Sequence, residues 1–254
     1  MKIELLKKWA NEISQKYQII ENYFTKGSFG VKFYPLLMYP CVRISHILSI
    51  KLIATLSIFL GLYYIFAELI TILFSNTSLI KAYLGHSTLE LLMPLGTIID
   101  NQTINMSPLS FTMRAIFFIQ GCTFVIIYLL GATQLSSRFR VLGVLSALLF
   151  SCGMIIISST QGGKFTDGGL QNLGASITFI LGNLTMIFAG LGVKSEKFKS
   201  FRIFSILGGL IGTTTILVTL FLDATYLPIL ERISLYAIML WEIRLGFNIL
   251  KQVR

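Results

Sequence analysis

Long uninterrupted apolar segments recur along this 254-residue chain, and short polar connections separate them. A helix needs about 20 mainly apolar residues to cross the roughly 30 Å hydrocarbon core of a bilayer. Strands of a membrane barrel would be about ten residues long and alternating, so continuous runs favour helices. Six segments qualify. The predicted spans are Leu52–Phe74, Ala115–Ala132, Val141–Ser159, Gly174–Val193, Ile203–Leu222 and Ile233–Leu250.

A different pattern precedes the first span. Apolar residues recur every three or four positions there, which predicts an amphipathic helix whose other face is mainly charged. Such a helix either lies in the membrane interface or packs beneath the bundle. We therefore predict an all-α polytopic membrane protein, with a cytoplasmic N-terminal segment (1–50) and a six-helix transmembrane domain (51–254). The apolar positions are Leu6, Trp9, Ile13, Tyr17, Ile20 and Phe24.

Glycine and proline residues and the longer loops mark further boundaries between the predicted helices. Gly27, Gly30, Pro35 and Pro40 predict a hinge before the first span. The long first outer loop, residues 75–113, contains a half-apolar stretch from Leu84 to Leu95 that is too short to span. We expect a short helix on the outer face there, or a re-entrant segment. The glycine-rich connection from Thr160 to Gly169 lacks a phosphate-binding motif and is interpreted as a flexible turn.

Composition agrees with a membrane protein. Apolar residues make up 54% of the chain and charged residues only 13%, where a soluble domain has about 25% charged residues. This balance excludes a soluble enzyme, a disordered tail and a secreted disulfide scaffold.

The net charge of +10 is distributed unevenly. Lys and Arg concentrate in the N-terminal segment, the second-to-third and fourth-to-fifth connections and the tail. The positive-inside rule therefore predicts a cell-membrane protein with both termini in the cytoplasm. No basic stripe alternates with aromatic residues, so we expect no nucleic-acid partner.

Three groups of residues together resemble a known family. They are Tyr83 to Ser87 with Leu91 to Gly96, then Gln171, Gly174, Ala175, Phe179, Gly182 and Asn183, and then Glu231, Arg232 and Trp241. The resemblance is to the six-span prokaryotic membrane proteins catalogued as domain of unknown function 998, and it extends from about Leu52 to Leu250. It implies a six-span fold and a topology, but no reaction. This chain departs from the family pattern at Gln171, where histidine is usual, and at Leu84, where proline is usual.

Charged residues inside spans are the first candidates for function, because each costs roughly 2.5 to 3.5 kcal/mol at a helix centre. Glu68, Glu242 and Arg244 are of this kind. Glu242 and Arg244 are two residues apart, about 200° around a helix, so they cannot pair with each other. We expect both to face the bundle interior and to find polar partners on other helices. Those partners indicate either a structural ion pair or a polar cavity.

A second set of candidates lies towards the outer side. Glu68 with Arg114, Glu231 and Arg232 predicts an ion-pair cluster that ties helix ends or binds an anionic or zwitterionic headgroup. The neutral side chains of Gln120, Asn183 and Gln171 are candidates for interhelical hydrogen bonds or a polar site. Small-residue stripes predict close helix packing. These stripes are Gly143, Ala147 and Ser151, and Gly208 with Gly212.

No residue set predicts catalysis, a cofactor or a metal site. Cys41, Cys122 and Cys152 form no C-x-x-C pair, so neither a disulfide framework nor zinc is expected. The predicted topology places His46 and His86 on opposite sides of the membrane. His86 with Glu90, one helical turn away, makes an acid–base pair possible, but nothing completes a catalytic constellation.

The sequence therefore favours a non-enzymatic accessory or interaction protein of the cell envelope or of export. Its expected partners are the lipid bilayer and another membrane protein. The alternative is a carrier or receptor for a small lipophilic ligand within the helix bundle. A lipid-modifying intramembrane enzyme is a third hypothesis, which the absence of a catalytic constellation disfavours.

Overall fold

The computed structural model describes residues 2–26, 36, 38–99, 102–104, 107–159, 169–219 and 227–253. Within these ranges, six helices are long and apolar enough to cross a membrane. The predicted all-α bundle is therefore confirmed. The spanning elements are α3 (Pro40–Leu73), α5 (Ser110–Ile127) with the π-helical turn η3 (Tyr128–Ala132) and α6 (Thr133–Leu135), α7 (Arg140–Ser159), α8 (Gly169–Gly192), α9 (Lys199–Thr219) and α10 (Leu227–Val253).

Each predicted span coincides with one of these helices, except that residues 220–222 of the fifth lie outside the described residues, and most helices extend beyond the span into polar residues. α3 shows this best, because it begins at Pro40, twelve residues before the predicted span at Leu52. Proline fits the first turn of a helix, where its missing N–H has no intrahelical partner. The helix therefore runs through the predicted boundary at residues 50 and 51. The predicted hinge residues Gly27, Gly30 and Pro35 lie outside the described residues.

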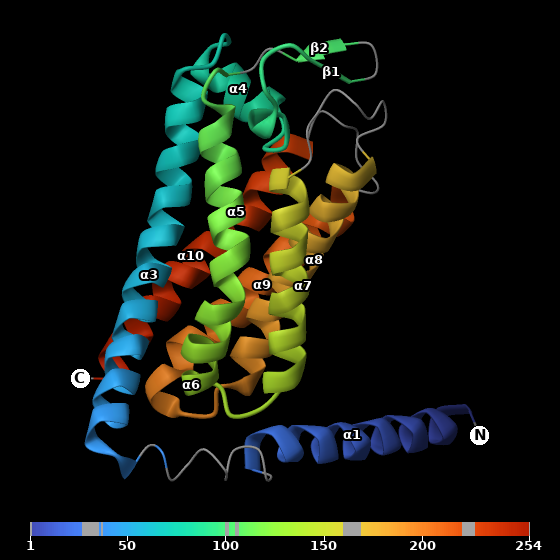
Figure 1. The fold of residues 1–254 in the computed structure, drawn as a ribbon. Coiled ribbons are helices and arrows are strands. Elements are labelled where there is room, and N and C mark those ends of the chain that lie inside the picture. Colours follow the sequence, from blue (N-terminus) through green and yellow to red (C-terminus); the bar gives the residue numbers. More distant parts are fainter. Residues whose placement is uncertain are drawn as a thin grey trace.

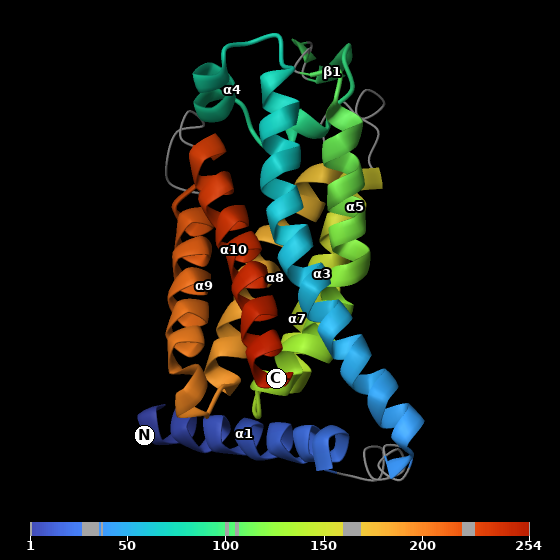
Figure 2. The same ribbon diagram turned by 90° about the vertical axis from the view of Figure 1, so that its left-hand side faces the viewer.

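The six spans form a closed ring. Consecutive helices pack side by side in the order α3, α5, α7, α8, α9 and α10, and α10 returns to pack against α3 (Figures 1 and 2). We call the end of the bundle that carries α1, the C-terminal turn of α10 and the lysines Lys197, Lys199 and Lys251 the basic end. The opposite end, which carries α4 and the strands, is the loop end.

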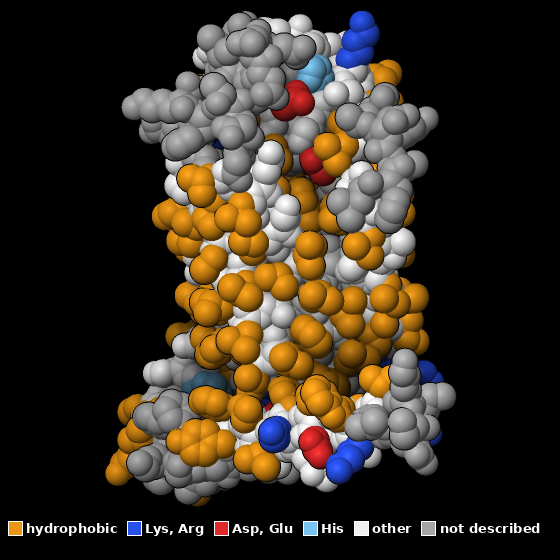
Figure 3. Space-filling view, turned by 90° about the vertical axis from the view of Figure 1, so that its right-hand side faces the viewer, with side chains coloured by type: hydrophobic (Ala, Val, Ile, Leu, Met, Phe, Trp, Pro, Cys, Tyr) orange, Lys and Arg blue, Asp and Glu red, His pale blue; other side chains and the backbone are white. Residues whose placement is uncertain are grey.

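Aromatic side chains fill the centre of the ring, and aliphatic side chains together with several phenylalanines cover its outside. Figure 3 shows a broad apolar belt around the middle of the molecule, with charged side chains at the two ends. The belt matches the surface that hydrocarbon chains require of a spanning bundle. The largest fully buried side chains include Trp241, Tyr64, Tyr128, Phe117, Phe124 and Phe150.

The π-helical turn in the second span has no signal in the hydrophobic pattern. It turns the Tyr128 ring into the core, where the ring lies 6.4 Å from that of Trp241. Gly143 on α7 faces the same ring, and a Cβ at that position would collide with the Tyr128 hydroxyl. Gly143 therefore makes room for an aromatic side chain, in agreement with the predicted packing role of its stripe.

The loop end differs from the prediction. A short helix, α4 (Leu79–Gly85), precedes most of the half-apolar stretch, and a single 3-10 turn, η2 (Glu90–Leu92), follows within it. The loop therefore contains a short helix, but only its last two residues fall within the stretch where a short helix or a re-entrant segment was predicted. The stretch instead buries Leu91 and Leu92 against the ends of α3 and α5, so a compact turn is enough to remove these apolar side chains from the surface.

A two-stranded hairpin follows at the loop end. The strands β1 (Thr97–Ile99) and β2 (Gln102–Ile104) are antiparallel, with Ile98 opposite Thr103. The predicted glycine-rich turn lies almost wholly outside the described residues, since only Gly169 belongs to a described element, α8.

The amphipathic helix α1 (Lys2–Lys26) is confirmed, and it lies across the basic end, roughly perpendicular to the spans (Figures 1 and 2). It contacts the bundle through few residues. The Tyr17 ring stacks on Phe139 at 6.1 Å, and the Glu21 carboxylate accepts a hydrogen bond from the Arg140 backbone N–H at 3.1 Å. Its apolar face stays largely uncovered, since Leu6 is 70%, Trp9 66% and Ile13 64% exposed.

Candidate functional site

A buried ion pair lies near the loop end, between the first and last spans. Arg232 on α10 donates from Nε to Glu68 Oε1 on α3 at 2.8 Å. Tyr236, one turn further along α10, donates to the other oxygen of Glu68 at 2.7 Å. The side chains of Arg232 and Glu68 are only 3% and 0% exposed. Burial strengthens the attraction between the charges but also removes their hydration, so each charge depends on its partner.

Arg232 also contacts the loop-end segment that follows α4. Its Nη1 donates to the His86 carbonyl at 2.8 Å and to the Pro228 carbonyl at 3.2 Å, and the guanidinium lies 4.7 Å from the centre of the Tyr83 ring. Burial, together with the nearby Glu68 carboxylate, raises the pKa of the Tyr83 phenol to about 12, and the Arg232 charge opposes this shift. Tyr83 is therefore a neutral ring at physiological pH that accepts the cation on its face.

Three further predicted residues contact the same segment, which we call the clamped segment (residues 83–92). Glu231 accepts hydrogen bonds from Ser87 Oγ at 2.6 Å and from the Thr88 N–H at 3.2 Å. Arg114 donates to the Leu92 carbonyl at 2.6 Å, and Gln171 donates to the Leu89 carbonyl at 3.3 Å.

The predicted outer cluster thus forms in a different way than expected. Glu68 and Arg232 form its ion pair, whereas Glu231 and Arg114 bind the clamped segment. Together with Gln171, these residues attach one loop to α3, α5, α8 and α10. Most of these contacts hold parts of the chain together, although Arg232 Nη2 makes no hydrogen bond, and this pattern favours the role of tying helix ends.

His86 and Glu90 lie on the outer side of this cluster. His86 Nδ1 is 2.7 Å from Glu90 Oε2, and both side chains are about one-third exposed. The neighbouring Ser87 hydroxyl donates to Glu231. The His86–Glu90 pair therefore lies beside a serine hydroxyl that is already hydrogen-bonded to the Glu231 carboxylate.

A second polar group lies in the middle of the bundle. Glu242 on α10 is fully buried and accepts a short hydrogen bond from Gln120 Nε2 on α5. Ser57 on α3 donates to the Glu242 backbone carbonyl at 2.7 Å. The expectation that Glu242 faces the interior with a polar partner on another helix is met. One oxygen of Glu242 and the carbonyl oxygen of Gln120 make no hydrogen bond.

Asn183 forms a similar contact between α8 and α10. It donates to the Ser234 hydroxyl at 2.7 Å and to the Phe179 carbonyl of its own helix at 2.6 Å. On the neighbouring interface, the Trp241 indole donates to Ser205 on α9 at 2.8 Å. Each pair joins two helices, as expected of polar side chains in a bundle.

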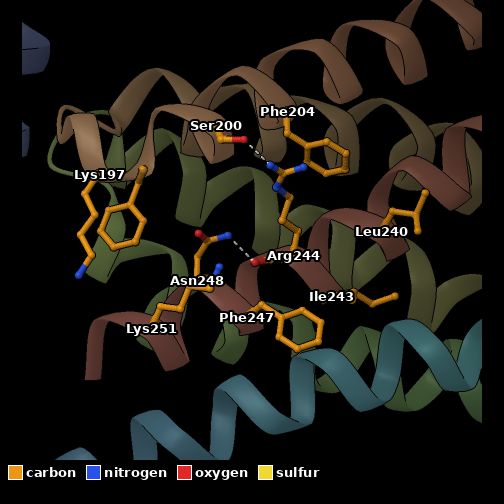
Figure 4. A pocket seen from close by; sticks show the side chains of 10 residues that line it. Lys197, Ser200, Phe204, Leu240, Ile243, Arg244, Phe247, Asn248 and Lys251 are labelled. Carbon is orange, nitrogen blue, oxygen red and sulfur yellow. Dashed lines mark hydrogen bonds between the residues drawn. The ribbon is translucent and has the colours of Figure 1, made fainter. Parts of the chain in front are cut away.

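Arg244 is where the expectation fails. It has a polar partner on another helix, since Nη2 donates to Ser200 on α9 at 2.6 Å. However, it lines an outward-facing pocket between α9 and α10 rather than the bundle interior, because its position on α10 is turned about 200° from that of Glu242. The guanidinium lies over the Phe204 ring at 4.6 Å (Figure 4).

Sequence reasoning missed the residues that complete the loop-end site. Tyr236 carries no charge and sits in an apolar run, but its spacing of four from Arg232 places it on the same helix face. Ser87 and Thr88 belong to a loop whose course no periodicity reveals. Within the described residues, no group of three or more His, Cys, Asp or Glu side chains is arranged to hold a metal ion. The three cysteines are free and exposed.

No protein-family model matches the chain, and neither do any of the curated proteins or solved structures searched, so the resemblance to the six-span family stays a prediction.

Proposed function

We propose that this chain is a non-enzymatic membrane protein of the cell envelope that works by contacting another membrane protein, and that α1 is its contact element. The observation that carries the proposal is the uncovered apolar face of α1. That helix meets the bundle through Tyr17 and Glu21, while Leu6, Trp9 and Ile13 stay exposed. An apolar face held beside a bundle without packing on it is typical of an interaction surface.

The proposal includes the orientation of the chain. Lys197, Lys199 and Lys251 gather at the basic end, where both chain ends also lie. The positive-inside rule places such an end in the cytoplasm. A six-span topology also agrees with the resemblance to the prokaryotic family, which we retain as part of the proposal.

A non-catalytic role fits the use made of the acidic residues. Glu68 is paired with Arg232, Glu231 holds the clamped segment, and Glu242 bonds to Gln120. Each carboxylate thus connects two parts of the fold. A general acid or base would instead need to face a reacting group within hydrogen-bond reach.

Site-specific photo-crosslinking in native membranes tests the proposal. A photoreactive residue in place of Ile13 should give a discrete adduct with a second protein. The same residue in place of Gln15, about 160° away on the helix, is the matched control and should give none. Adducts with lipid alone, with another copy of this chain, or equally from both positions would contradict the proposal.

A second candidate is a carrier or receptor for a small lipophilic ligand. It is favoured by a pocket of about 390 Å³ near the loop end, between α8, α9 and α10, which is mostly apolar and includes Glu231. Replacing the half-buried Ile216 of this pocket by tryptophan should remove any co-purifying small molecule seen by native mass spectrometry. A mass spectrum with no such molecule in the unmodified protein would count against this candidate.

A further inference from the structure

The pocket around Arg244 combines cations with apolar walls. It lies between the first turns of α9 and the last turns of α10, at the basic end, and its volume is about 650 Å³ (Figure 4). Sites for small ligands in proteins commonly have volumes of about 300–1,000 Å³. Its cationic residues are Lys197, Arg244 and Lys251, and none of the described residues that line it is acidic.

The Arg244 side chain runs from within the span to the basic end. α10 has 27 residues, so it is about 40 Å long, close to the full thickness of a bilayer with its headgroups. Arg244 is nine residues before Val253, and its Cα is therefore about 13 Å from that end. The headgroup layer of one leaflet is only about 5–7 Å thick. In a bilayer matched to α10 the Cα would lie below that layer, whereas the guanidinium reaches Ser200 in the first turn of α9.

The Arg244 charge lacks an anionic partner within the described part of the chain. Its contacts are the Ser200 hydroxyl and the Phe204 ring. Arg232, the other arginine of α10, instead has the Glu68 carboxylate at 2.8 Å. Placing a cation inside a membrane costs free energy unless an anion or water neutralises its charge. A negative group from outside the chain would therefore be stabilised in this pocket.

The walls indicate where that group comes from. Leu240 and Phe247 are 48% and 52% exposed, and together with Ile243 they form an apolar strip along α10 beside the cations. A strip of this kind matches an acyl chain, and a cluster of Lys and Arg above it matches a phosphate. Basic pockets between spans on the cytoplasmic side commonly bind anionic lipid headgroups.

We propose that this pocket binds an anionic phospholipid, with its phosphate between Arg244, Lys197 and Lys251 and an acyl chain along Leu240, Ile243 and Phe247. The lipid supplies the negative charge that the described protein does not give Arg244. This site is independent of the interaction proposed for α1.

Lipid binding to the purified full-length protein tests the proposal. Native mass spectrometry in detergent would compare phosphatidylglycerol with phosphatidylcholine carrying the same chains. Phosphatidylglycerol should bind at least about tenfold more tightly, and Arg244→Gln or Lys251→Gln should each weaken it about five- to tenfold. Lys199→Gln removes an equal charge at the same end but outside the pocket, so it should leave binding unchanged.

The source of the phosphate is distinguished with glycerol 3-phosphate. If this soluble compound competes at concentrations similar to the lipid, the pocket is a site for free phosphate esters and the lipid proposal is wrong. Equal binding of the two lipids, or equal loss in Lys199→Gln and Arg244→Gln, would also overturn it. Because two separate residues are tested, misfolding of one variant leaves the other to decide.

Discussion

Environment decides what each charged side chain does in this protein. Arg232 and Lys199 both have a carboxylate partner, Glu68 at 2.8 Å and Glu196 at 3.7 Å, respectively. The first pair is buried and supported by Tyr236, whereas the second lies exposed at the basic end. Breaking a buried pair leaves a charge without hydration, and breaking an exposed pair returns both charges to water.

Arg232→Leu should therefore lower the free energy of unfolding by about 3–5 kcal/mol, because Glu68 remains buried without its cation. Lys199→Gln, the matched control, should change it by no more than about 1 kcal/mol. Thermal or denaturant unfolding in detergent measures both. Similar losses in the two variants would show that the Glu68–Arg232 pair is not the source of the effect.

A second residue-scale prediction concerns two glycines one turn apart on α9. A Cβ on Gly212 would collide with the Asn183 side chain and disturb its bond to Ser234, so Gly212→Ala should cost about 1–3 kcal/mol. A Cβ on Gly208 meets only the flexible end of Met186, at 2.9 Å. Gly208→Ala should thus be neutral or stabilising by up to about 1 kcal/mol, since alanine favours helix. The reverse order of stabilities would contradict this packing.

At the scale of elements, the spans and α1 are held in different ways. The spans pack around a closed ring with aromatic side chains inside it. By contrast, α1 makes few contacts with the bundle, among them the Tyr17–Phe139 ring stack and the hydrogen bond from the Arg140 backbone N–H to Glu21. An element attached by so few contacts adds little to the stability of the part it touches.

Deletion of residues 2–26 should therefore leave the six spans folded. The melting temperature in detergent should fall by no more than about 2–4 °C, which corresponds to about 1 kcal/mol for a domain of this size. Circular dichroism and size-exclusion chromatography of the shortened protein measure this. A variant that aggregates, or melts far below the full chain, would show instead that α1 is part of the structural core.

At the scale of the whole molecule, the bundle has two unlike ends. The basic end carries α1, a group of lysines that includes Lys197, Lys199 and Lys251, and the Arg244 pocket, and the loop end carries the clamped segment and the hairpin. An apolar belt lies between them (Figure 3). Such asymmetry is what orients a membrane protein during insertion, since clusters of Lys and Arg resist translocation.

Reporter fusions test this orientation. Fusions after Lys199 and after Lys251 should report the cytoplasm, because both positions lie at the basic end. A fusion after Gly85, at the loop end, should report the outside. A cytoplasmic signal from the Gly85 fusion would overturn the topology, while the arrangement of the six helices would stand.

The sequence by itself determined the number of spans, the parity of the two termini and the amphipathic character of α1. These depend on hydrophobic periodicity and segment length, which are local properties. It also singled out Glu68, Glu242 and Arg232, because charge is improbable in a span without a partner. Short helices, turns and the π-helical turn at Tyr128 carry no such periodic signal.

Only the tertiary structure decided which partners these residues have. Glu242 and Arg244 lie about 200° apart on the same apolar helix, and the sequence does not say which of the two faces the bundle interior. The ring arrangement turns Glu242 towards Gln120 and Arg244 out towards the groove beside α9. In the same way, the clamped segment takes its shape from contacts with residues far away along the chain, such as Glu231 and Gln171. Contacts of this kind arise only when the helices pack, because no local rule fixes which faces meet.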